Sequence, residues 1–266
     1  MKAFISERYG PPEMLRMAEV EKPVPVADEA LVKVLAVSVN PADWRSMRAK
    51  PFFSRATLGL LRPKHRILGV DIAGRVEAVG SGVTQFKPGD DVYANLLDHG
   101  LGGFAEYVSV PVEVMSLKPA NLSFEEAAAV PMAAVTALQG LRHHGEVQAG
   151  QRVLINGASG GIGTFAVQIA KSYGSEVTGV TGTRNIDLVR SLGAKHIADY
   201  TRTSSVTGGA TTSSSTRSGT CRCRRVHQLL DELGAPDYGA TGWRRGSPGP
   251  VRSRRGTADS VRRSGS

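Results

Sequence analysis

The sequence predicts an α/β protein in which a compact β domain precedes an incomplete doubly wound parallel sheet. Three observations predict this order. Short runs rich in β-branched residues, separated by Gly, Pro and Asn turns, fill residues 1–122. The hydrophobic period changes to that of a helix from Ser123. A strand, a glycine-rich turn and a helix then follow one another over residues 151–172. We therefore expect domains at residues 1–122 and 123–202, followed by a tail.

Four runs in the first domain have the composition of strands. Each alternates apolar with other side chains or is rich in Val and Ala, and each ends at a turn signal such as Asn-Pro or Gly-Ser-Gly. They are residues 30–39, 69–79, 85–94, which contains a Pro-Gly-Asp turn, and 103–110.

The second domain begins with helices and continues as alternating strands and helices. Ser123 is a suitable N-cap, because carboxylates follow it in the first turn. The expected helices are residues 123–129, 133–141, 162–172 and 185–192, and the expected strands are 151–156, 176–181 and 196–198. The order of these strands and of the last two helices is β-α-β-α-β, which is half of a dinucleotide-binding fold.

The turn after residues 151–156 suits the pyrophosphate of a dinucleotide. Gly160 allows close approach of the backbone, Gly163 allows the helix to pack on the strand, and the free N–H groups of the helix start attract phosphate. Ala158 stands where the first glycine of such turns is usual. The expected binding residues are Ala158, Ser159, Gly160, Gly161, Ile162 and Gly163. The alternative is a tight turn that only packs well.

The next strand ends in residues that favour NADPH over NADH. About 20 residues past the turn, an Asp or Glu would bind the adenosine ribose of NAD, but here the chain has Thr181, Thr183 and Arg184. A guanidinium pairs with a 2′-phosphate through charge-assisted bonds. We expect these three residues and Tyr200 to bind NADPH. The alternative is that Arg184 is a solvated residue of a first helical turn.

The positive charge lies mostly in the tail. The chain has a net charge of +9, yet residues 1–200 hold 21 Lys and Arg against 20 Asp and Glu, whereas residues 201–266 hold 12 against 4. The tail lacks Lys, Phe, Ile and Met, and 42 of its 66 residues are Arg, Ser, Gly or Thr. Such a composition predicts a disordered basic tail. The other interpretation, which we favour, is a reading-frame shift after Arg202 in a GC-rich coding sequence.

Several protein classes are disfavoured by the sequence. No apolar run approaches the roughly 18 residues of a membrane-spanning helix, and residues 1–10 contain too few apolar residues for a signal peptide. We therefore expect a cytoplasmic protein without a membrane partner. Cys221 and Cys223 are too close to bridge each other. The tail has only Tyr238 and Trp243 as aromatic residues, which disfavours a nucleic-acid partner.

Several motifs follow one another along the first 137 residues and lead to the glycine turn. They are VSVNPADW at 37–44, GVDIAG at 69–74, KPGDDV at 87–92, GGFAEY at 102–107 and AVPMAAVTA at 129–137. In this order they resemble the motifs of the medium-chain dehydrogenase/reductase superfamily, and within it the zinc-independent quinone oxidoreductase-like group. The resemblance covers residues 1 to about 202. It implies a GroES-like substrate domain, the first half of a Rossmann NADP-binding domain, an active site between them, and a homodimer where the fold is complete.

The resemblance implies a site without zinc. Zinc-dependent relatives hold their metal with Cys, His and Cys or Asp, and the corresponding positions here are Asn40, Val70 and Met132. Neither an aliphatic side chain nor a thioether is a useful zinc ligand. We expect hydride transfer from NADPH to a quinone or an α,β-unsaturated carbonyl, since both are electron-poor without a Lewis acid.

Three residues are candidates for the catalytic site. Asn40 can donate its amide to the acceptor carbonyl as negative charge develops there, or it can simply end a strand before Pro41. We expect Asp43 to be structural rather than an acid or base, and the resemblance places Thr136 near the nicotinamide. Three alternatives stay open for the chain: an NADP-dependent alcohol dehydrogenase, an inactive truncated dehydrogenase fragment, and a nucleic-acid-associated protein with a basic tail.

Overall fold

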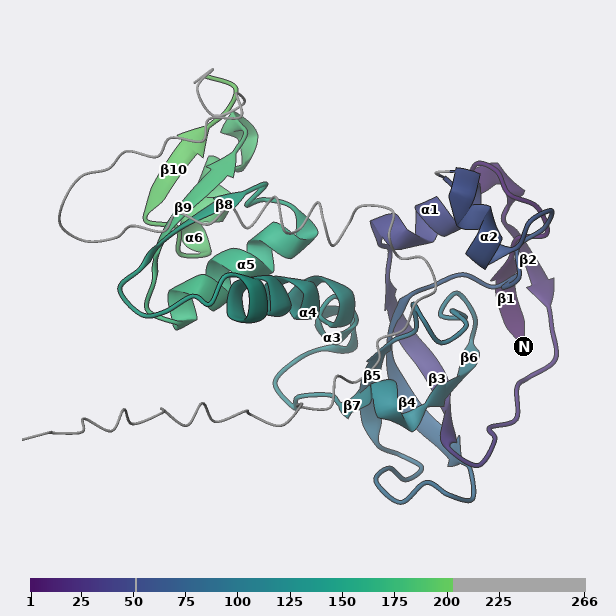
Figure 1. The fold of residues 1–266 in the computed structure, drawn as a ribbon. Helices are drawn as coiled ribbons and strands as arrows, with labels where there is room; N and C mark the ends of the chain where they lie inside the picture. Colours follow the sequence, from purple (N-terminus) through teal and green to yellow (C-terminus); the bar gives the residue numbers. More distant parts are fainter. Residues whose placement is uncertain (51, 203–266) are drawn as a thin grey trace, which may run out of the picture.

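The computed structural model describes residues 1–50 and 52–202 and consists of a β domain and an α/β domain (Figure 1). The β domain is coloured purple to blue, and the α/β domain teal to green, with helices α3 and α4 between them (Figure 1). The tail of residues 203–266, with its two interpretations, lies outside the described residues.

The β domain is built on a five-stranded antiparallel sheet with the order β6-β3-β4-β5-β7. Val32, Ile72, Val92 and Val110 lie buried at its centre. A separate antiparallel pair, β1 and β2, lies beside it. The strands are β1 (Lys2–Ile5), β2 (Arg16–Glu19), β3 (Glu29–Ser38), β4 (Asp71–Val79), β5 (Asp91–Asn95), β6 (Tyr107–Pro111) and β7 (Met115–Leu117), with short 3-10 turns η1 (Pro12–Met14), η2 (Phe52–Ser54) and η3 (Val112–Val114).

The four strands expected in this domain are confirmed as β3 to β6, and two short helices were not predicted. Helix α1 (Pro41–Arg48) begins where the sequence indicated only the end of a strand. The Asp43 carboxylate accepts the backbone N–H of Asn40 at 2.7 Å, and Pro41 occupies the first helical position, which is a favourable helix start. Helix α2 (Arg55–Leu58) follows η2.

Helices α3 (Phe124–Ala128) and α4 (Pro131–Gln139) connect the two domains. Ser123 and Glu126 form the capping box of α3, in which the Ser123 hydroxyl accepts the Glu126 N–H at 3.2 Å. Helix α3 packs on β3 and β4, with Ala127 and Ala128 against Ala73, whereas α4 packs on α5. Helix α4 starts two residues earlier than expected because proline fits the first turn. It continues as a π-helical turn, η4 (Gly140–His144).

The α/β domain is the predicted half of a doubly wound fold. Its parallel sheet has the order β10-β9-β8, and Ile155, Val167 and Val177 lie in its core. Within the described residues, β8 pairs on one side only. The elements are β8 (Arg152–Asn156), α5 (Gly161–Ser172), β9 (Glu176–Thr181), η5 (Thr183–Asn185), α6 (Ile186–Ser191) and β10 (His196–Asp199). Residues 1–50 and 52–202 contain no helix with the length and hydropathy needed to cross a bilayer.

Candidate active site

The glycine turn leaves open space at the start of α5. Gly157 has a φ of +70°, and a Cβ placed on Gly163 would lie 2.1 Å from the Gly157 carbonyl oxygen, so only glycine fits there. A Cβ on Gly161 would meet no atom within 4 Å. The exposed helix start therefore fits the pyrophosphate of a dinucleotide, with its N–H groups toward the phosphates.

Side chains behind the turn connect it to β9. The Ser159 hydroxyl accepts hydrogen bonds from Thr181 Oγ1 at 2.9 Å and from Asn185 Nδ2 at 3.2 Å. Ala158 is buried, and its N–H donates to Val180 O at 3.0 Å. Ile162 packs on the core. Thr181 is also buried, so it supports the turn rather than facing solvent.

An open pocket of about 310 Å³ lies at the ends of β9 and β10. It brings together Thr183, Arg184 and Tyr200, three of the residues expected to bind NADPH. The ring of Tyr200 lies over Gly182, where a Cβ would approach the phenol oxygen to 3.0 Å. Arg184 has no ion pair with an acidic residue of the described chain, so its charge is available to an anion.

A carboxylate that sequence reasoning missed lies beside this pocket. Asp199, at the end of β10, accepts hydrogen bonds from Thr183 Oγ1 at 2.6 Å and from Thr201 Oγ1 at 2.7 Å. These bonds hold the pKa of Asp199 below its usual range. Because the Thr183 hydroxyl hydrogen is committed to Asp199, Arg184 and Tyr200 are the groups free to meet a phosphate. The sequence did contain a signal for Asp199: parallel strands end at the same edge of a sheet, so a carboxylate at the end of β10 must lie near the end of β9.

A second site surrounds Asp71, at the start of β4, which is fully buried. One carboxylate oxygen accepts Asn40 Nδ2 at 3.1 Å, Ser38 Oγ at 3.2 Å and the Met132 N–H at 3.1 Å. The other accepts Asn95 Nδ2 at 2.9 Å. Burial raises the pKa of Asp71 to about 6, against the opposing effect of these donors. Sequence analysis placed Asp71 within a motif but gave it no role.

The Asp71 network uses both amide hydrogens of Asn40. Its Nδ2 donates to Ser38 Oγ at 2.9 Å as well as to Asp71. In this arrangement Asn40 has no hydrogen left for an acceptor carbonyl, so donation to a substrate requires one of these bonds to break. The expected oxyanion role of Asn40 therefore stays a prediction, and it requires the loss of its hydrogen bond to Ser38 or to Asp71.

The other two catalytic candidates are engaged within the fold. Asp43 is buried, which raises its pKa, while the backbone N–H groups of Asn40, Gly69 and Val70 lower it. It holds the start of α1, as a structural residue would. The Thr136 hydroxyl donates to the Met132 carbonyl at 2.6 Å, one helical turn back in α4.

The residues at the expected zinc positions do not fit a zinc ion. Asn40 and the Met132 backbone are bound to Asp71, and Val70 is buried in an apolar cluster with Met132 at its edge. The donor set is thus one amide, one thioether and one aliphatic side chain. Residues 1–50 and 52–202 hold no cluster of three His, Cys, Asp or Glu side chains able to bind a metal.

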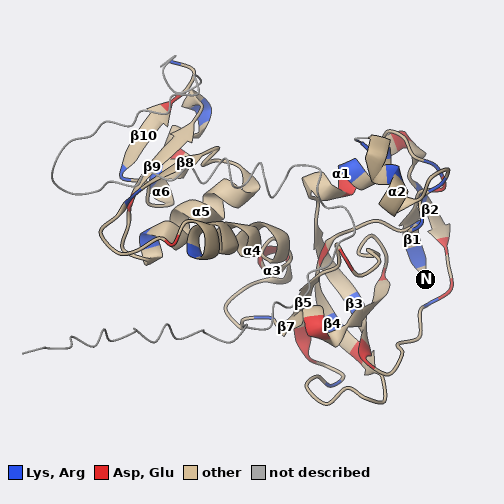
Figure 2. Ribbon diagram, in the orientation of Figure 1, with Lys and Arg blue, Asp and Glu red and all other residues tan. Residues whose placement is uncertain are grey.

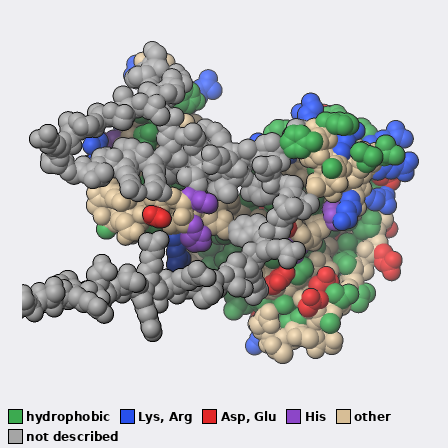
Figure 3. Space-filling view, viewed as in Figure 1, with side chains coloured by type: hydrophobic (Ala, Val, Ile, Leu, Met, Phe, Trp, Pro, Cys, Tyr) green, Lys and Arg blue, Asp and Glu red, His purple; other side chains and the backbone are tan. Residues whose placement is uncertain are grey.

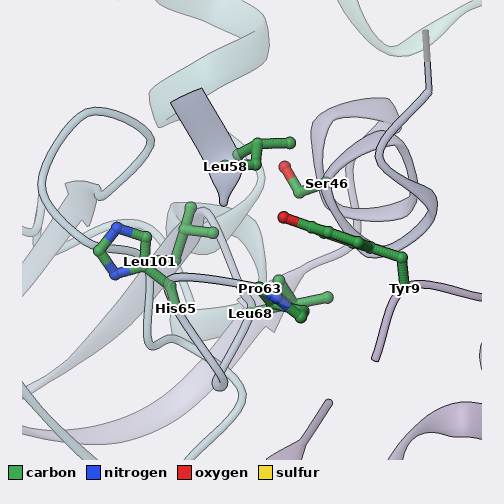
Figure 4. A pocket seen from close by; sticks show the side chains of 7 residues that line it. All are labelled: Tyr9, Ser46, Leu58, Pro63, His65, Leu68 and Leu101. Carbon is green, nitrogen blue, oxygen red and sulfur yellow. The ribbon is translucent and has the colours of Figure 1, made fainter. Parts of the chain in front are cut away.

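A second cavity, between α1 and α2, is too small for a substrate. Its volume is about 10 Å³, which is roughly the space of one water molecule. Figure 4 shows the Tyr9 ring and Leu58 facing this space, together with His65 and Leu101.

Comparison with known proteins identifies the fold and its relatives. Residues 26–120 match the alcohol dehydrogenase GroES-like domain family. A chloroplastic quinone-oxidoreductase homolog of Spinacia oleracea is 39% identical over 202 residues, which cover 72% of this chain and 58% of that protein. A chloroplastic NADPH-dependent alkenal/one oxidoreductase of Arabidopsis thaliana is 37% identical over 211 residues, covering 76% and 53%. Residues 26–120 thus form an alcohol dehydrogenase GroES-like domain, and over about the first 200 residues the chain is similar to quinone and alkenal/one oxidoreductases.

Solved structures show the same likeness. The quinone oxidoreductase from Coxiella burnetii superposes with a TM-score of 0.70 at 32% identity, covering 77% of this chain and 64% of that one. The fold is therefore the α/β architecture of the superfamily, as expected. The chain spans little more than half the length of the curated relatives it matches.

Proposed function

We propose that this chain carries the nucleotide site and part of the substrate site of an oxidoreductase that transfers a hydride from NADPH to a quinone or an α,β-unsaturated carbonyl without zinc. The observation that carries the proposal is the pocket of Thr183, Arg184 and Tyr200 beside the open glycine turn. Relatives named as NADPH-dependent and quinone oxidoreductases support it. When bound, NADPH supplies the hydride.

Residues of the α/β domain bind and orient the nucleotide. The N–H groups at the start of α5 meet the pyrophosphate, and Arg184 pairs with the 2′-phosphate while Tyr200 lies against the adenosine side. Asp199 keeps Thr183 oriented. Its ionised carboxylate repels phosphate, so Arg184 must outweigh it for the pocket to favour NADPH over NADH.

Residues of the β domain position the acceptor. Asp71 fixes the Asn40 amide in the β domain and the N-terminal end of α4. Because α4 packs on α5 of the α/β domain, this one carboxylate links the two domains. Met132, which is only partly buried, offers apolar contact to the acceptor, whereas Val70 packs in the core behind it. Without a Lewis acid to polarise it, the acceptor must already be electron-poor.

Two measurements test this function. Calorimetric titration should show tighter binding of NADPH than of NADH, and equal affinities would contradict the cofactor assignment. Elemental analysis should find no stoichiometric zinc, and chelators should leave any reduction of a 2-alkenal or quinone unchanged. About one zinc per chain that resists dialysis would overturn the zinc-independent proposal.

An inactive fragment is the second candidate, and the β8 edge favours it. Within the described residues, the α/β sheet has three strands, whereas a complete doubly wound sheet continues beyond its first strand. NADPH binding without turnover of alkenals or quinones would support this candidate. The cytoplasmic location and the homodimer stay predictions.

A further inference from the structure

Residues 44–50 and 52–66 lie on the surface of the β domain and include most of α1 and all of α2. Residues 44–66 are called here the basic apolar segment, and Pro51 within them lies outside the described residues. The segment holds seven Lys or Arg residues and no Asp or Glu. The rest of residues 1–202 holds 15 Lys or Arg against 20 Asp or Glu. The positive charge of this part of the chain is therefore concentrated on one side of the β domain, near α1 and α2 (Figure 2).

Large apolar side chains of the same segment are exposed. Leu61 is 86% exposed and Phe52 71%, and their neighbours Leu60 and Phe53 are also more than half exposed. Hydrophobic and basic side chains lie next to one another over this part of the molecule (Figure 3). Exposed apolar side chains that gather on one part of a surface are typical of interaction sites.

The segment is fixed on the β domain. The Tyr9 hydroxyl donates to the Gly59 carbonyl at 2.7 Å, directly after α2. The Arg55 guanidinium lies 5.0 Å from the ring centres of both Tyr9 and Phe52. Met47, the buried residue of the segment in α1, packs in a cluster with Leu68, Val70 and Leu101. The contacts of Gly59 and Arg55 with Tyr9 therefore fix the backbone from which the exposed apolar side chains project.

Most of its cations remain available to a partner. Arg66 pairs with Glu7 at 2.7 Å, but Arg48, Lys50, Arg62 and Lys64 form no ion pair with any acidic residue that the structure describes. All four side chains are exposed. A partner that complements the segment must therefore be anionic and must also accept apolar side chains.

We propose that the basic apolar segment docks on the surface of a bilayer that contains anionic lipids. Phe52, Phe53, Leu60 and Leu61 enter the boundary between headgroups and acyl chains, and the surrounding Lys and Arg side chains bind the lipid phosphates. The expectation of no membrane partner rested on the lack of a bilayer-spanning apolar run and of a signal peptide. Peripheral docking needs no such run.

The charge and the side-chain types of the segment favour an anionic bilayer over a second copy of the chain or a nucleic acid. A second copy would bring two acid-free basic surfaces together, which repel. A single-stranded nucleic acid would stack on Phe52 and Phe53, but the most exposed member of the segment, Leu61, has no stacking face. A bilayer uses both the aliphatic and the basic side chains.

The test uses the full chain and its two tryptophans. Trp44 lies at the edge of the segment and Trp243 in the tail, so Trp243→Phe leaves Trp44 as the single reporter. Vesicles of phosphatidylcholine with phosphatidylserine, labelled with brominated lipid, should quench Trp44 fluorescence. Quenching should be weak with phosphatidylcholine alone and should fall as salt is raised.

Matched variants separate the segment from the basic tail. Arg62→Glu combined with Lys64→Glu should lower the vesicle partition coefficient by about tenfold or more, and Phe52→Ser with Leu61→Ser should lower it similarly. Val24→Ser, at an exposed apolar residue elsewhere, should leave it unchanged. Circular dichroism and thermal unfolding confirm that each variant is folded.

Three results would overturn the proposal. Vesicle binding that is unaffected by both double variants, with Trp44 unquenched, would assign it to the tail. A concentration-dependent dimer in sedimentation that Leu61→Ser abolishes would assign the segment to a second copy. Binding of single-stranded oligonucleotide that Phe52→Ser abolishes, without vesicle binding, would assign it to nucleic acid.

Discussion

Arg184 and its neighbours decide cofactor choice at the scale of single residues. The guanidinium is the one basic group that lines the pocket, and Asp199 beside it is ionised. A group that carries the 2′-phosphate contact should matter for NADPH and not for NADH, because NADH lacks that phosphate.

We predict that Arg184→Ala weakens NADPH binding by about 1 to 3 kcal/mol, as expected for one charge-assisted hydrogen bond. NADH binding should change little. Calorimetric titration of both nucleotides measures the difference. Arg190→Ala, an exposed α6 arginine outside the pocket lining, is the control. Equal losses for NADPH and NADH would contradict the assigned contact.

Asp71 should make stability depend on pH. Its folded pKa, about 6, lies above the unfolded value, so its contribution to the free energy of unfolding is present below about pH 4 and is lost as pH rises through 6. The loss is roughly 3 kcal/mol at full ionisation. Denaturant unfolding of the wild type between pH 4 and 7 should show this fall.

Asp71→Asn should remove most of that pH dependence. It should also lower stability throughout, because the new NH₂ group replaces either the oxygen that accepts from Asn95 or the oxygen that accepts from Asn40 and the Met132 N–H. Asp98→Asn, which alters an exposed carboxylate of the same domain, should keep the wild-type profile. An unchanged slope in Asp71→Asn would show that another group carries it.

At the scale of elements, two glycines of the turn have different roles: Gly163 allows packing, and Gly161 leaves space for a ligand. A Cβ on Gly163 meets backbone at 2.1 Å, whereas one on Gly161 enters open space. Both positions belong to the same helix start, which makes them a matched pair.

Gly163→Ala should cost roughly 1 to 3 kcal/mol of unfolding free energy, because the turn and α5 must move apart. Gly161→Ala should leave stability unchanged or raise it by up to about 1 kcal/mol, yet it should weaken nucleotide binding, since its methyl group occupies the phosphate side. Thermal unfolding and nucleotide titration distinguish the two. Equal destabilisation would show that the turn is not held as described.

Element order was predictable from the sequence, whereas the hydrogen-bonding partners were not. Apolar periodicity predicted β8, α5 and β9 closely, because local pattern and burial agree there. Helix α1 was missed because its start depends on a buried carboxylate that looks like any polar residue in a turn. Asp71 and Asp199 act through residues distant in sequence, so only the folded arrangement shows them.

At the scale of the whole molecule, the chain spans little more than half of its relatives, and β8 has a free edge within residues 1–50 and 52–202. An unpaired central strand of a parallel sheet lacks the neighbour that covers its backbone groups. A shifted reading frame stays our favoured interpretation of residues 203–266, which lie outside the described residues.

We predict that the nucleotide sequence, read in another frame after codon 202, encodes periodic apolar strands. The chain with that frame restored should be longer and should reduce alkenals or quinones with NADPH. Sequencing the coding region and assaying the restored protein provide the measurements. Stop codons close behind codon 202 in both other frames would refute the frame shift.

Helices α3 and α4 contact both domains, which limits where two related chains can be joined into a chimera. Ala127 and Ala128 cover Ala73 of the β domain, and the Met132 N–H completes the shell of Asp71. A chimera joined at residue 122 would therefore pack the α3 and α4 of another parent on Ala73 and Asp71, and the foreign helix would have to place its backbone N–H as Met132 does. A junction in the loop after η4, beyond His144, would transfer the β domain together with the two helices that finish its interior.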